Sequence, residues 1–346
     1  MHGTIYEFAK LPGLDRRGTN VLPALLTRPR KIRAVPLVGI IRNPRSHRNK
    51  GQAAELANCS NILTETPATR AALVDALADF QRRGVDYLAV DGGDGTVRDV
   101  LTCGAAIFGD NWPDMIVLPK GKTNALAVDI GVPSGWTLPE ALEAASCGRE
   151  VTRHPIRLIP ANGEGCVQGF VLGGGVFTLA TQAGQDAHRW GAFNSLAVGL
   201  TVLWSIVLCA FGASSNRWRR LTQMRLRDPR GGQELPHSRH GQRGARFLFF
   251  ASSFEHFPLG IRPFGPAAGA GMKLLVLDAP LRGLLALMPL YLAGSTARFF
   301  ERWGAHRFVA DDLDVELGGS FVFDGEEFPQ GRYRLQNGPL LNFVVP

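Results

Sequence analysis

The sequence predicts two domains, an α/β domain built on a parallel sheet and a mainly β domain after it. The chain has 346 residues, which exceeds the length that one hydrophobic core usually serves. Between residues 35 and 155, apolar strand patterns alternate with helical patterns, as in parallel sheets covered by helices. Beyond residue 155, short alternating runs separated by glycine-rich turns take over, and these favour antiparallel strands.

The first domain starts with a strand and contains one helix with clear end signals. Its strands are expected at residues 35–41, 61–64, 87–90 and 115–118. Thr69 can cap the N-terminus of a helix that ends at Gly84. Within that helix, Leu73, Leu77 and Phe80 recur on one face, so this face is expected to pack on the sheet.

The second half is predicted to form an antiparallel β domain. Strands are expected at residues 166–172, 224–226, 246–250, 273–277 and 320–323. Hairpin turns are expected at Asn162-Gly163 and at residues 230–232. The predicted boundaries are an N-terminal extension at 1–33, an α/β domain at 34–155 that residues 331–346 complete, and a β-rich domain at 156–330.

Composition limits the class of partner. A formal net charge of +8 and a pI near 9.6 favour anionic partners such as nucleotides or an anionic membrane surface. Nucleic acid is not expected, because no RNA-binding or zinc-finger pattern accompanies the arginines. The five cysteines are far apart without a metal-binding spacing, which favours a reducing cytoplasm.

One segment differs from the rest of the second half. Residues 190–216 contain no Asp, Glu, Lys or Arg, and residues 196–211 are apolar on every helical face. The length permits a membrane span, but glycine and polar residues dilute the segment, and a buried helix would have the same composition. Because arginines follow directly, attachment to an anionic lipid surface is favoured over a span.

The loop Gly92–Thr96 follows the third expected strand, at the edge of the sheet where α/β proteins bind ligands. Gly92, Gly93 and Gly95 can adopt φ > 0 and bring backbone N–H groups against phosphate oxygens, ahead of a helix that begins at Val97. Asp94 would repel a phosphate unless a divalent cation lay between them, so Mg²⁺ is expected. The alternative is a tight Asp-Gly turn without a ligand.

A further loop follows the fourth expected strand. Gly121-Lys122-Thr123 is not a P-loop, because position 116 is Ile where that motif has glycine. Thr123 and Asn124 can open a helix whose free N–H groups bind ribose or phosphate, with Lys120 or Lys122 adding positive charge. Simple helix capping is the alternative.

Four motifs in order resemble the diacylglycerol kinase catalytic-domain family, which includes sphingosine and ceramide kinases and bacterial lipid kinases. The motifs cover residues 35 to 346. They are Asn43-Pro44 with Ser46 and Gly51, then Gly92-Gly93-Asp94-Gly95-Thr96, then Pro119 with Gly121, Asn124 and Ala127, and last Asp324-Gly325-Glu326.

The resemblance implies a fold and a site. The fold would be a three-layer α/β domain like those of NAD kinase and phosphofructokinase, a C-terminal antiparallel β-sandwich that binds lipid, and a cleft between them. ATP would contact Asn43, Thr64, Gly92, Gly93, Asp94, Gly95, Thr96, Gly121, Thr123 and Asn124. Asp324, Glu326 and Asp94 would be the catalytic carboxylates, with Asp94 and Asp324 also holding Mg²⁺.

The implied activity is transfer of the γ-phosphoryl group of ATP to a lipid hydroxyl, with diacylglycerol, ceramide or a sphingoid base as acceptor. A positioned carboxylate can take the hydroxyl proton. The protein is expected to be cytoplasmic and bound peripherally to the inner face of the membrane, and a second copy of the chain is a candidate partner.

The chain departs from the family pattern at three places, and these leave two alternatives open. Lys122 replaces a usual threonine, Ala125 replaces a common acidic residue, and Ala270-Gly271 stands where some bacterial members bind a second metal. One alternative is a NAD kinase-like enzyme with a soluble substrate, which shares the Gly-Gly-Asp-Gly loop. The other is a catalytically silent module that binds nucleotide and lipid.

Overall fold

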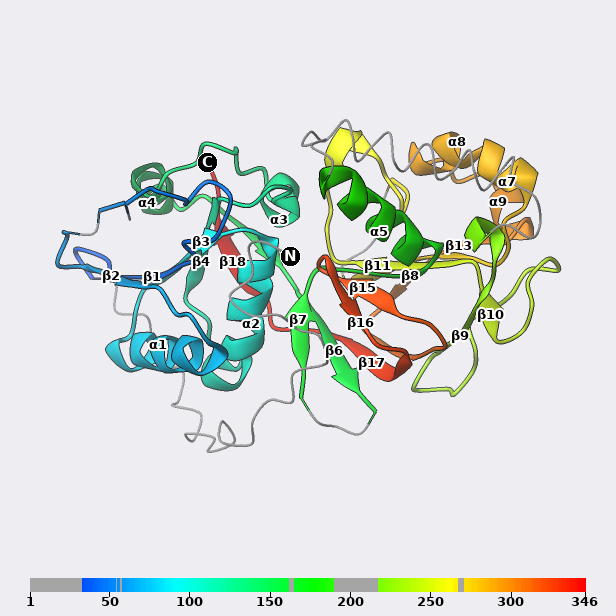
Figure 1. The fold of residues 1–346 in the computed structure, drawn as a ribbon, viewed down its shortest axis with the longest axis horizontal. Coiled ribbons are helices and arrows are strands. Elements are labelled where there is room, and N and C mark those ends of the chain that lie inside the picture. The colour runs from blue at the N-terminus through cyan, green and yellow to red at the C-terminus, as the bar shows by residue number, and fades with distance from the viewer. Residues whose placement is uncertain (1–32, 54, 57, 162–164, 190–216, 267–270) are drawn as a thin grey trace.

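The computed structural model describes residues 33–346 except 54, 57, 162–164, 190–216 and 267–270, and Figure 1 shows its elements. The predicted N-terminal extension, the apolar segment at 190–216, the Asn162-Gly163 turn and Ala270 therefore lie outside the described residues.

A mixed six-stranded sheet forms the α/β domain, in the order β2-β1-β3-β4-β18-β5. Its strands are β1 (Val38–Arg42), β2 (Ile62–Glu65), β3 (Tyr87–Gly92), β4 (Asp114–Pro119), β5 (Glu150–Arg153) and β18 (Leu341–Val344). The first four strands and β18 run parallel, and β5 joins β18 in the antiparallel sense. The carboxyl ends of the parallel strands therefore share one edge.

Helices cover both faces of this sheet. They are α1 (Arg70–Arg83), α2 (Asp94–Phe108), α3 (Ala125–Asp129) and α4 (Leu138–Ser146). Figure 1 shows α1 and α2 on one face and α3 and α4 on the other. As expected, the Thr69 side chain accepts a hydrogen bond from the N–H of Ala72 at the start of α1, and Gly84 ends α1 with a φ of 63°.

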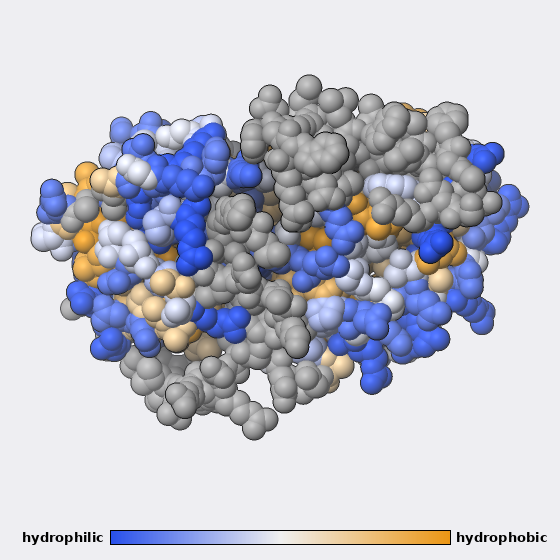
Figure 2. Space-filling model, in the orientation of Figure 1, coloured by the Kyte–Doolittle hydropathy of each residue, from blue (hydrophilic) through white to orange (hydrophobic). Residues whose placement is uncertain are grey.

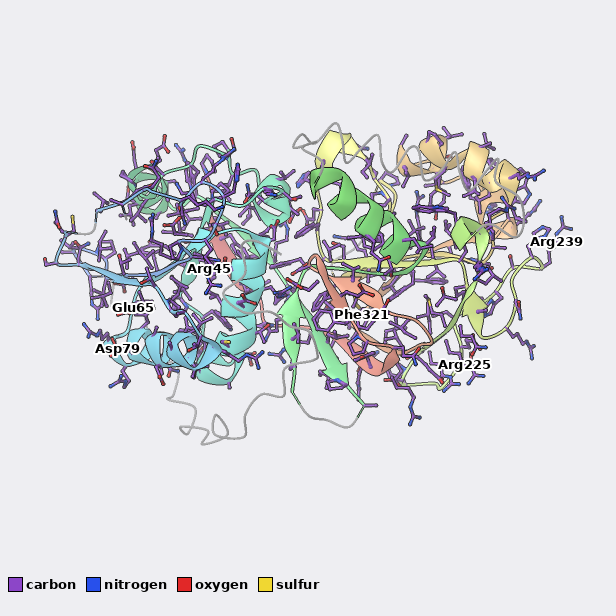
Figure 3. The ribbon with its side chains drawn as sticks, viewed as in Figure 1. Arg45, Glu65, Asp79, Arg225, Arg239 and Phe321 are labelled. Carbon is purple, nitrogen blue, oxygen red and sulfur yellow. The ribbon has the colours of Figure 1, made fainter. Side chains whose placement is uncertain are left out.

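Two six-stranded antiparallel sheets form the β domain. The first contains β6 (Ile156–Pro160), β7 (Val167–Gly169), β9 (Thr222–Arg227), β10 (Ala245–Arg246), β14 (Asp312–Leu317) and β17 (Gly331–Asn337). The second contains β8 (Val171–Gly175), β11 (Leu248–Ser252), β12 (Met272–Leu277), β13 (Ala305–Ala310), β15 (Phe321–Phe323) and β16 (Glu326–Phe328). The sheets share one buried core that includes Phe321, which Figure 3 shows inside the domain, whereas Arg225 and Arg239 lie at its periphery.

The chain changes sheets twice where the sequence predicted single strands. The run at 166–172 is split, because β7 pairs with β6 in one sheet while β8 pairs with β11 and β15 in the other. The run at 246–250 divides in the same way into β10 and β11. Phe170 and Phe247 stand at the two crossings, where a residue belongs to neither ladder and its N–H group needs another acceptor.

The β domain also carries helices that the sequence interpretation did not name. They are α5 (Val176–Arg189), α7 (Arg282–Ala286), α8 (Met288–Leu292) and α9 (Phe299–Arg302). Figure 1 shows them over one face of the second sheet, and a separate buried cluster joins Phe247 and Leu275 to Leu284 and Phe300. Within the described ranges, no helix combines the length and the apolar character that crossing a membrane requires.

The C-terminal segment divides between the two domains. Residues 331–346 were expected to complete the α/β sheet as a unit, but β17 belongs to the β domain and pairs with β14 and β6. The return to the α/β sheet is made by β18, which lies beside β4. A strand that alternates exposed and buried residues, as β17 does, suits a sandwich with one solvated face rather than a covered sheet.

Two joints hold the domains together beside the strand-end edge. Helix α2 packs against β7, and the N–H of Gln168 donates to Thr102 Oγ1 at 3.1 Å. At the end of α3, Asp129 accepts hydrogen bonds of 2.7 Å from the N–H groups of both Glu255 and His256. Arg153 donates to the same carboxylate at 2.7 Å. These contacts fix the wall of the β domain relative to the strand-end loops.

Replacing Gly39 by Ala is expected to lower the free energy of unfolding by about 1–3 kcal/mol. A Cβ at this position would lie 2.6 Å from the ring of Phe80, which is buried at 1% exposure and cannot move aside without opening the core. Gly135→Ala is the matched control, because a Cβ there meets no atom within 4 Å. Urea denaturation of the two variants gives the comparison, and equal midpoints would contradict this account of the Gly39 contact.

Candidate active site

A cavity of about 320 Å³ lies between the domains at the strand-end edge, a volume within the range of small-molecule sites. Its α/β wall is made of the start of α2 and the 121–126 loop, including Gly93, Asp94, Gly121 and Lys122. Its opposite wall comes from the β domain and includes Phe170, Phe254, Asp324 and Glu326. Three of the four predicted motifs therefore meet in one cavity.

The glycines of the first loop are needed for close approach and not for φ > 0, which corrects the prediction. None of Gly92, Gly93 and Gly95 has a positive φ, and Gly93 has φ −100° and ψ −176°. A Cβ on Gly92 would lie 2.6 Å from Thr96 Cβ, and one on Gly93 would lie 2.8 Å from the Cα of Gly121. The two loops thus touch backbone to backbone, a contact that any side chain would prevent.

Asp94 is the first residue of α2, which begins three residues earlier than predicted. Its carboxylate accepts hydrogen bonds from the N–H groups of Ala125 at 2.9 Å and Leu126 at 3.2 Å, and so caps the short helix α3. Burial raises the pKa of Asp94 from its usual value, against the effect of these hydrogen bonds. The aspartate thus has a structural role that does not depend on a cation.

The Gly121–Asn124 turn is closed by the Asn124 amide. Asn124 Oδ1 accepts from the N–H of Gly121 at 2.8 Å, and Nδ2 donates to the Gly121 carbonyl at 3.1 Å. Asn124 has φ 52°, a left-handed conformation that Asn adopts more readily than most residues, and it makes no capping bond to α3. The predicted capping role therefore passes from Asn124 to Asp94.

Asp324 and Gly325 form the two-residue turn of the β15–β16 hairpin. Their φ values are 43° and 80°, as a type I′ turn requires, so the alternative interpretation of Asp-Gly-Glu as a turn holds at the level of the backbone. The Asp324 carboxylate nevertheless has a specific partner. It accepts from the N–H groups of Phe170 at 3.0 and 3.1 Å and of Val171 at 2.8 Å, where the chain changes sheets.

The environment of Asp324 favours its neutral form more than water does. Burial of the carboxylate raises the pKa of Asp324 to about 7, although the two backbone N–H groups and Arg98 act to lower it and Asp94 acts to raise it. The side chain is half-buried and lines the cavity. A carboxylate with this pKa changes charge near neutral pH, as a general base requires.

Glu326 faces the base of the cavity from the first residue of β16. Its side chain is buried, and Oε1 lies 3.9 Å from Nη2 of Arg98, which is completely buried in α2. The same Arg98 nitrogen donates to Asp99 Oδ1 at 3.1 Å. Glu326 therefore lies beside a buried cation, whereas Asp324 is held by the backbone N–H groups of Phe170 and Val171.

Several predicted nucleotide contacts lie behind the cavity wall. Asn43 Nδ2 donates to Thr96 Oγ1 at 3.0 Å, and both residues are buried, so they brace the glycine loop from the β1 side. Gly92 packs closely against Thr96, and the Asn124 amide closes the turn at Gly121, so both residues also support the loops from behind. Thr64 lies within β2, in register with Ile40, and is absent from the cavity lining. Gly93, Asp94, Gly95, Gly121 and Thr123 are the predicted contacts that line the cavity.

Lys120, one of the two lysines predicted to add positive charge to the site, forms an ion pair with Glu55 instead, with its Nζ 3.2 Å from the carboxylate. Lys122 lines the cavity instead. Sequence reasoning also missed the apolar lining, which consists of Val97, Leu126, Phe170, Val171 and Phe254. No periodicity in the sequence marks these apolar positions.

The donor set suits a divalent cation that arrives with a nucleotide. Among the residues described, no group of three or more His, Cys, Asp or Glu side chains is placed to hold a metal alone. Mg²⁺ in nucleotide sites commonly takes one or two carboxylates together with phosphate oxygens and waters. Asp94 and Asp324, on opposite walls of one cavity, meet that requirement.

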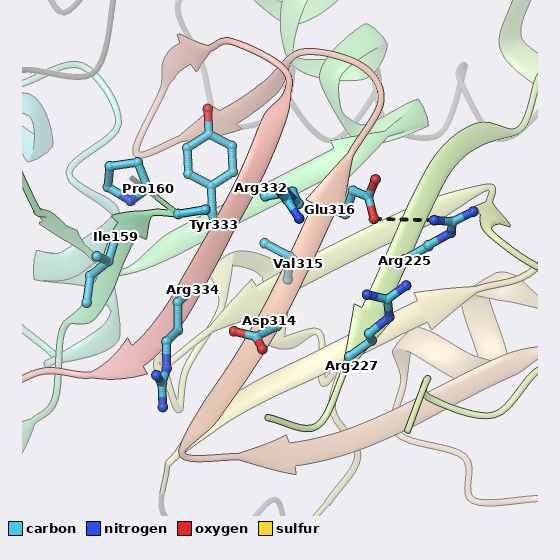
Figure 4. Close-up of a pocket in the computed structure, with 11 residues that line it drawn as sticks. Ile159, Pro160, Arg225, Arg227, Asp314, Val315, Glu316, Arg332, Tyr333 and Arg334 are labelled. Carbon is cyan, nitrogen blue, oxygen red and sulfur yellow. Dashed lines mark ion pairs between the residues drawn. The ribbon is translucent and has the colours of Figure 1, made fainter. Parts of the chain in front are cut away.

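A second concave surface lies on the outer face of the β9–β14–β17 sheet, with a volume of about 510 Å³ (Figure 4). Here acids and arginines alternate across the strands: Glu316 stands in register with Arg225 and Arg332, and its carboxylate lies 3.5 Å from Arg225. Figure 2 shows hydrophilic residues over this end of the molecule, around β9 and β10. Cross-strand charge pairs of this kind stabilise a solvated sheet face, so the surface is not assigned to the reaction.

Comparisons with known proteins find similarity to lipid kinases. The model of the diacylglycerol kinase catalytic domain matches residues 38–158. Two curated relatives, both named "Probable lipid kinase YegS", come from Shigella flexneri and Escherichia coli O1:K1, and each is 31% identical over 96 residues. The aligned stretch covers 28% of this chain and 30% of each relative, so it spans less than a third of their length.

A solved structure extends the likeness of fold to both domains. The crystal structure of a diacylglycerol kinase from Bacillus anthracis str. Sterne superposes with a TM-score of 0.60 at 13% identity, over 91% of this chain and 98% of that one. At this identity the similarity establishes the fold alone. The match of residues 38–158 to the diacylglycerol kinase catalytic domain confirms the resemblance predicted from the motifs.

Proposed function

We propose that the protein is an ATP-dependent lipid kinase that transfers the γ-phosphoryl group to a hydroxyl of a membrane lipid. The observation that carries the proposal is the position of Asp324, a carboxylate with a pKa of about 7 that faces the glycine loops across one cavity. The catalytic domain matched at residues 38–158 and the names of the relatives support the same reaction class.

The α/β wall supplies the nucleotide side. The backbone contact between Gly93 and Gly121 keeps side chains out of this wall, and α2 directs the positive end of its dipole into the cavity. Lys122 adds positive charge at the rim. ATP with Mg²⁺, when bound, supplies the phosphoryl group and neutralises its charge. Asp94 and Asp324 are the residues that would hold the cation.

Asp324 is proposed as the general base. It would accept the proton of the lipid hydroxyl at a carboxylate oxygen as the hydroxyl attacks phosphorus. The N–H groups of Phe170 and Val171 hold the carboxylate in one orientation, and they belong to a backbone that two sheets fix on either side. The base is therefore rigid relative to the glycine loops, as phosphoryl transfer requires.

The β wall is suited to a lipid acceptor. Phe170 and Phe254 line the cavity and stack with their ring centroids 5.5 Å apart. From Phe254, ring contacts of 6.0 and 5.7 Å lead through Phe257 to Phe264. Phe264 stacks on Phe250 at 5.5 Å, beside the second sheet. This row of aromatic side chains begins at the cavity, and its half-buried members Phe250 and Phe257 would offer apolar surface to a lipid chain, which a soluble acceptor does not need.

The assay that tests the proposal offers γ-labelled ATP, Mg²⁺ and mixed micelles containing diacylglycerol, ceramide or a sphingoid base. Label is expected in the lipid extract, and Asp324→Asn is expected to lower kcat by about 10²–10⁴-fold, since general-base catalysis contributes on that order. The same mixture with NAD distinguishes a soluble acceptor. Labelled NAD without labelled lipid, or nucleotide binding without turnover, would contradict the proposal in favour of the two alternatives.

The pH dependence follows from the raised pKa of Asp324. The base form predominates above about pH 7, so kcat/KM is expected to fall about tenfold for each pH unit below 7 and to level above it. A carboxylate at its ordinary value of 3.8 would instead keep the activity constant down to about pH 5. Initial rates between pH 5 and 9 at subsaturating lipid separate the two outcomes.

Gly93→Ala is expected to weaken nucleotide binding more than it weakens the fold. A Cβ placed 2.8 Å from Gly121 Cα forces the two loops apart, because the obstacle is backbone and cannot change rotamer. The dissociation constant for ATP is expected to rise by about tenfold or more, corresponding to about 1.4 kcal/mol. Isothermal titration measures it, with Gly135→Ala as a control; a dissociation constant equal to that of the control would refute the contact's role.

Peripheral binding to an anionic membrane belongs to the same proposal. The net charge of +8 supports it, and the proposed acceptor resides in a bilayer.

A further inference from the structure

Arg98 has an environment that is rare for arginine. Its side chain is fully buried, with 0% exposure, one helical turn after Asp94 in α2. A guanidinium is almost never buried without carboxylate partners, because removal from water costs several kcal/mol. Its partners therefore indicate why the sequence keeps a charge at this position.

Those partners come from both domains. Nη2 donates to Asp99 Oδ1 at 3.1 Å within α2, and the same atom lies 3.9 Å from Glu326 Oε1 on β16. Asp99 is fully buried and Glu326 is 7% exposed, so water screens these charges only weakly. The guanidinium thus joins the helix that starts in the α/β wall to the hairpin that carries Asp324.

Because of the hairpin geometry, the contact between Arg98 and Glu326 also affects the position of Asp324. Asp324 and Glu326 are separated by Gly325, and all three belong to a turn in which both Asp324 and Gly325 have positive φ. Such a turn has little freedom once its strands are paired. A shift of Glu326 would therefore move Asp324 against Phe170 and Val171.

We propose that Arg98 is a positioning residue: its buried guanidinium couples α2 to the Asp324–Glu326 turn and thereby fixes the Asp324 carboxylate relative to the glycine loops. This role rests on the proposed kinase function. Arg98 touches neither nucleotide nor acceptor in this account, and it acts through Glu326 and Asp324.

The test compares Arg98→Lys and Arg98→Met with a matched pair, Arg246→Lys and Arg246→Met. Arg246 is also fully buried and paired with a buried aspartate, Asp278, but it lies in the β domain away from the cavity. All four variants should lose stability in thermal denaturation. Arg98→Lys is expected to lower kcat on the order of 10- to 100-fold with KM for ATP little changed, since it keeps the charge but cannot reproduce the position of Nη2 between Asp99 and Glu326.

Arg98→Met removes the charge as well as the hydrogen bond to Asp99, so it is expected to lower kcat further than Arg98→Lys does, again with KM for ATP little changed. The Arg246 variants, assayed below their melting temperatures, should keep the wild-type kcat. Folded Arg98 variants with the wild-type kcat would overturn the proposal.

A readout without turnover separates failure of this proposal from failure of the kinase assignment. Nitrogen-15 NMR of the Phe170 and Val171 amides, which donate to the Asp324 carboxylate, needs no substrate. Their chemical shifts should change in Arg98→Met, change less in Arg98→Lys, and keep the wild-type values in the Arg246 variants. If the wild-type protein shows no kinase activity but the amide shifts move as stated, the coupling stands and the reaction is wrong; unchanged amide shifts in both Arg98 variants overturn the coupling.

Discussion

The site depends on backbone N–H groups that the fold leaves without a ladder partner and that two aspartates accept. Asp94 takes the first N–H groups of α3, and Asp324 takes those of Phe170 and Val171 at the crossing between sheets. An unsatisfied buried N–H costs about 1–3 kcal/mol, so each carboxylate is required by the backbone before any ligand arrives. The fold therefore brings two acids into one cavity for structural reasons, and the proposed chemistry uses them.

This arrangement explains why the walls of the cavity are rigid. The α/β wall is closed by the Gly93–Gly121 contact, which has no side chain that could rotate away. The β wall is closed by a hairpin turn anchored to a sheet crossing. The joint at Asp129, where N–H groups from the β domain reach the end of α3, fixes the distance between the walls.

Much of this could be predicted from the sequence where the signal is local. The side chain of Thr69 caps the start of α1, and Gly84 adopts the left-handed conformation that ends it, so both residues mark the ends of the helix in the sequence. The loops after β3 and β4 can be recognised from their glycines. The two sheet crossings could not be predicted, because residues 166–172 form one apolar run whose halves choose different partners far along the chain. The short helices α7 and α8 have too few residues for a periodicity to appear.

Gly92 and Gly93 were recognised correctly as a motif, but the structural reason for these glycines was predicted wrongly. Sequence reasoning assigned Gly92 and Gly93 to φ > 0, the usual demand on glycine, whereas the structure uses them for contact with Thr96 and Gly121. That demand depends on a second loop 28 residues away, so no local pattern encodes it. Arg98 was overlooked for a related reason: an arginine in a helix is ordinarily a surface residue, and its burial follows only from where β7 and β16 pack.

Opposing effects act on the pKa values of the two aspartates in the cavity, Asp94 and Asp324. Burial raises the pKa of both Asp94 and Asp324, while backbone N–H groups act to lower both. For Asp324, the charge of Asp94 acts in the same direction as burial, and Arg98 acts against it. In the proposed reaction a divalent cation would act on the side of ionisation at both residues. Cation binding and proton loss are then linked, so the base would become most available when the nucleotide and its metal are in place. The raised pKa of Asp324 is therefore consistent with a proposed site that its substrate completes.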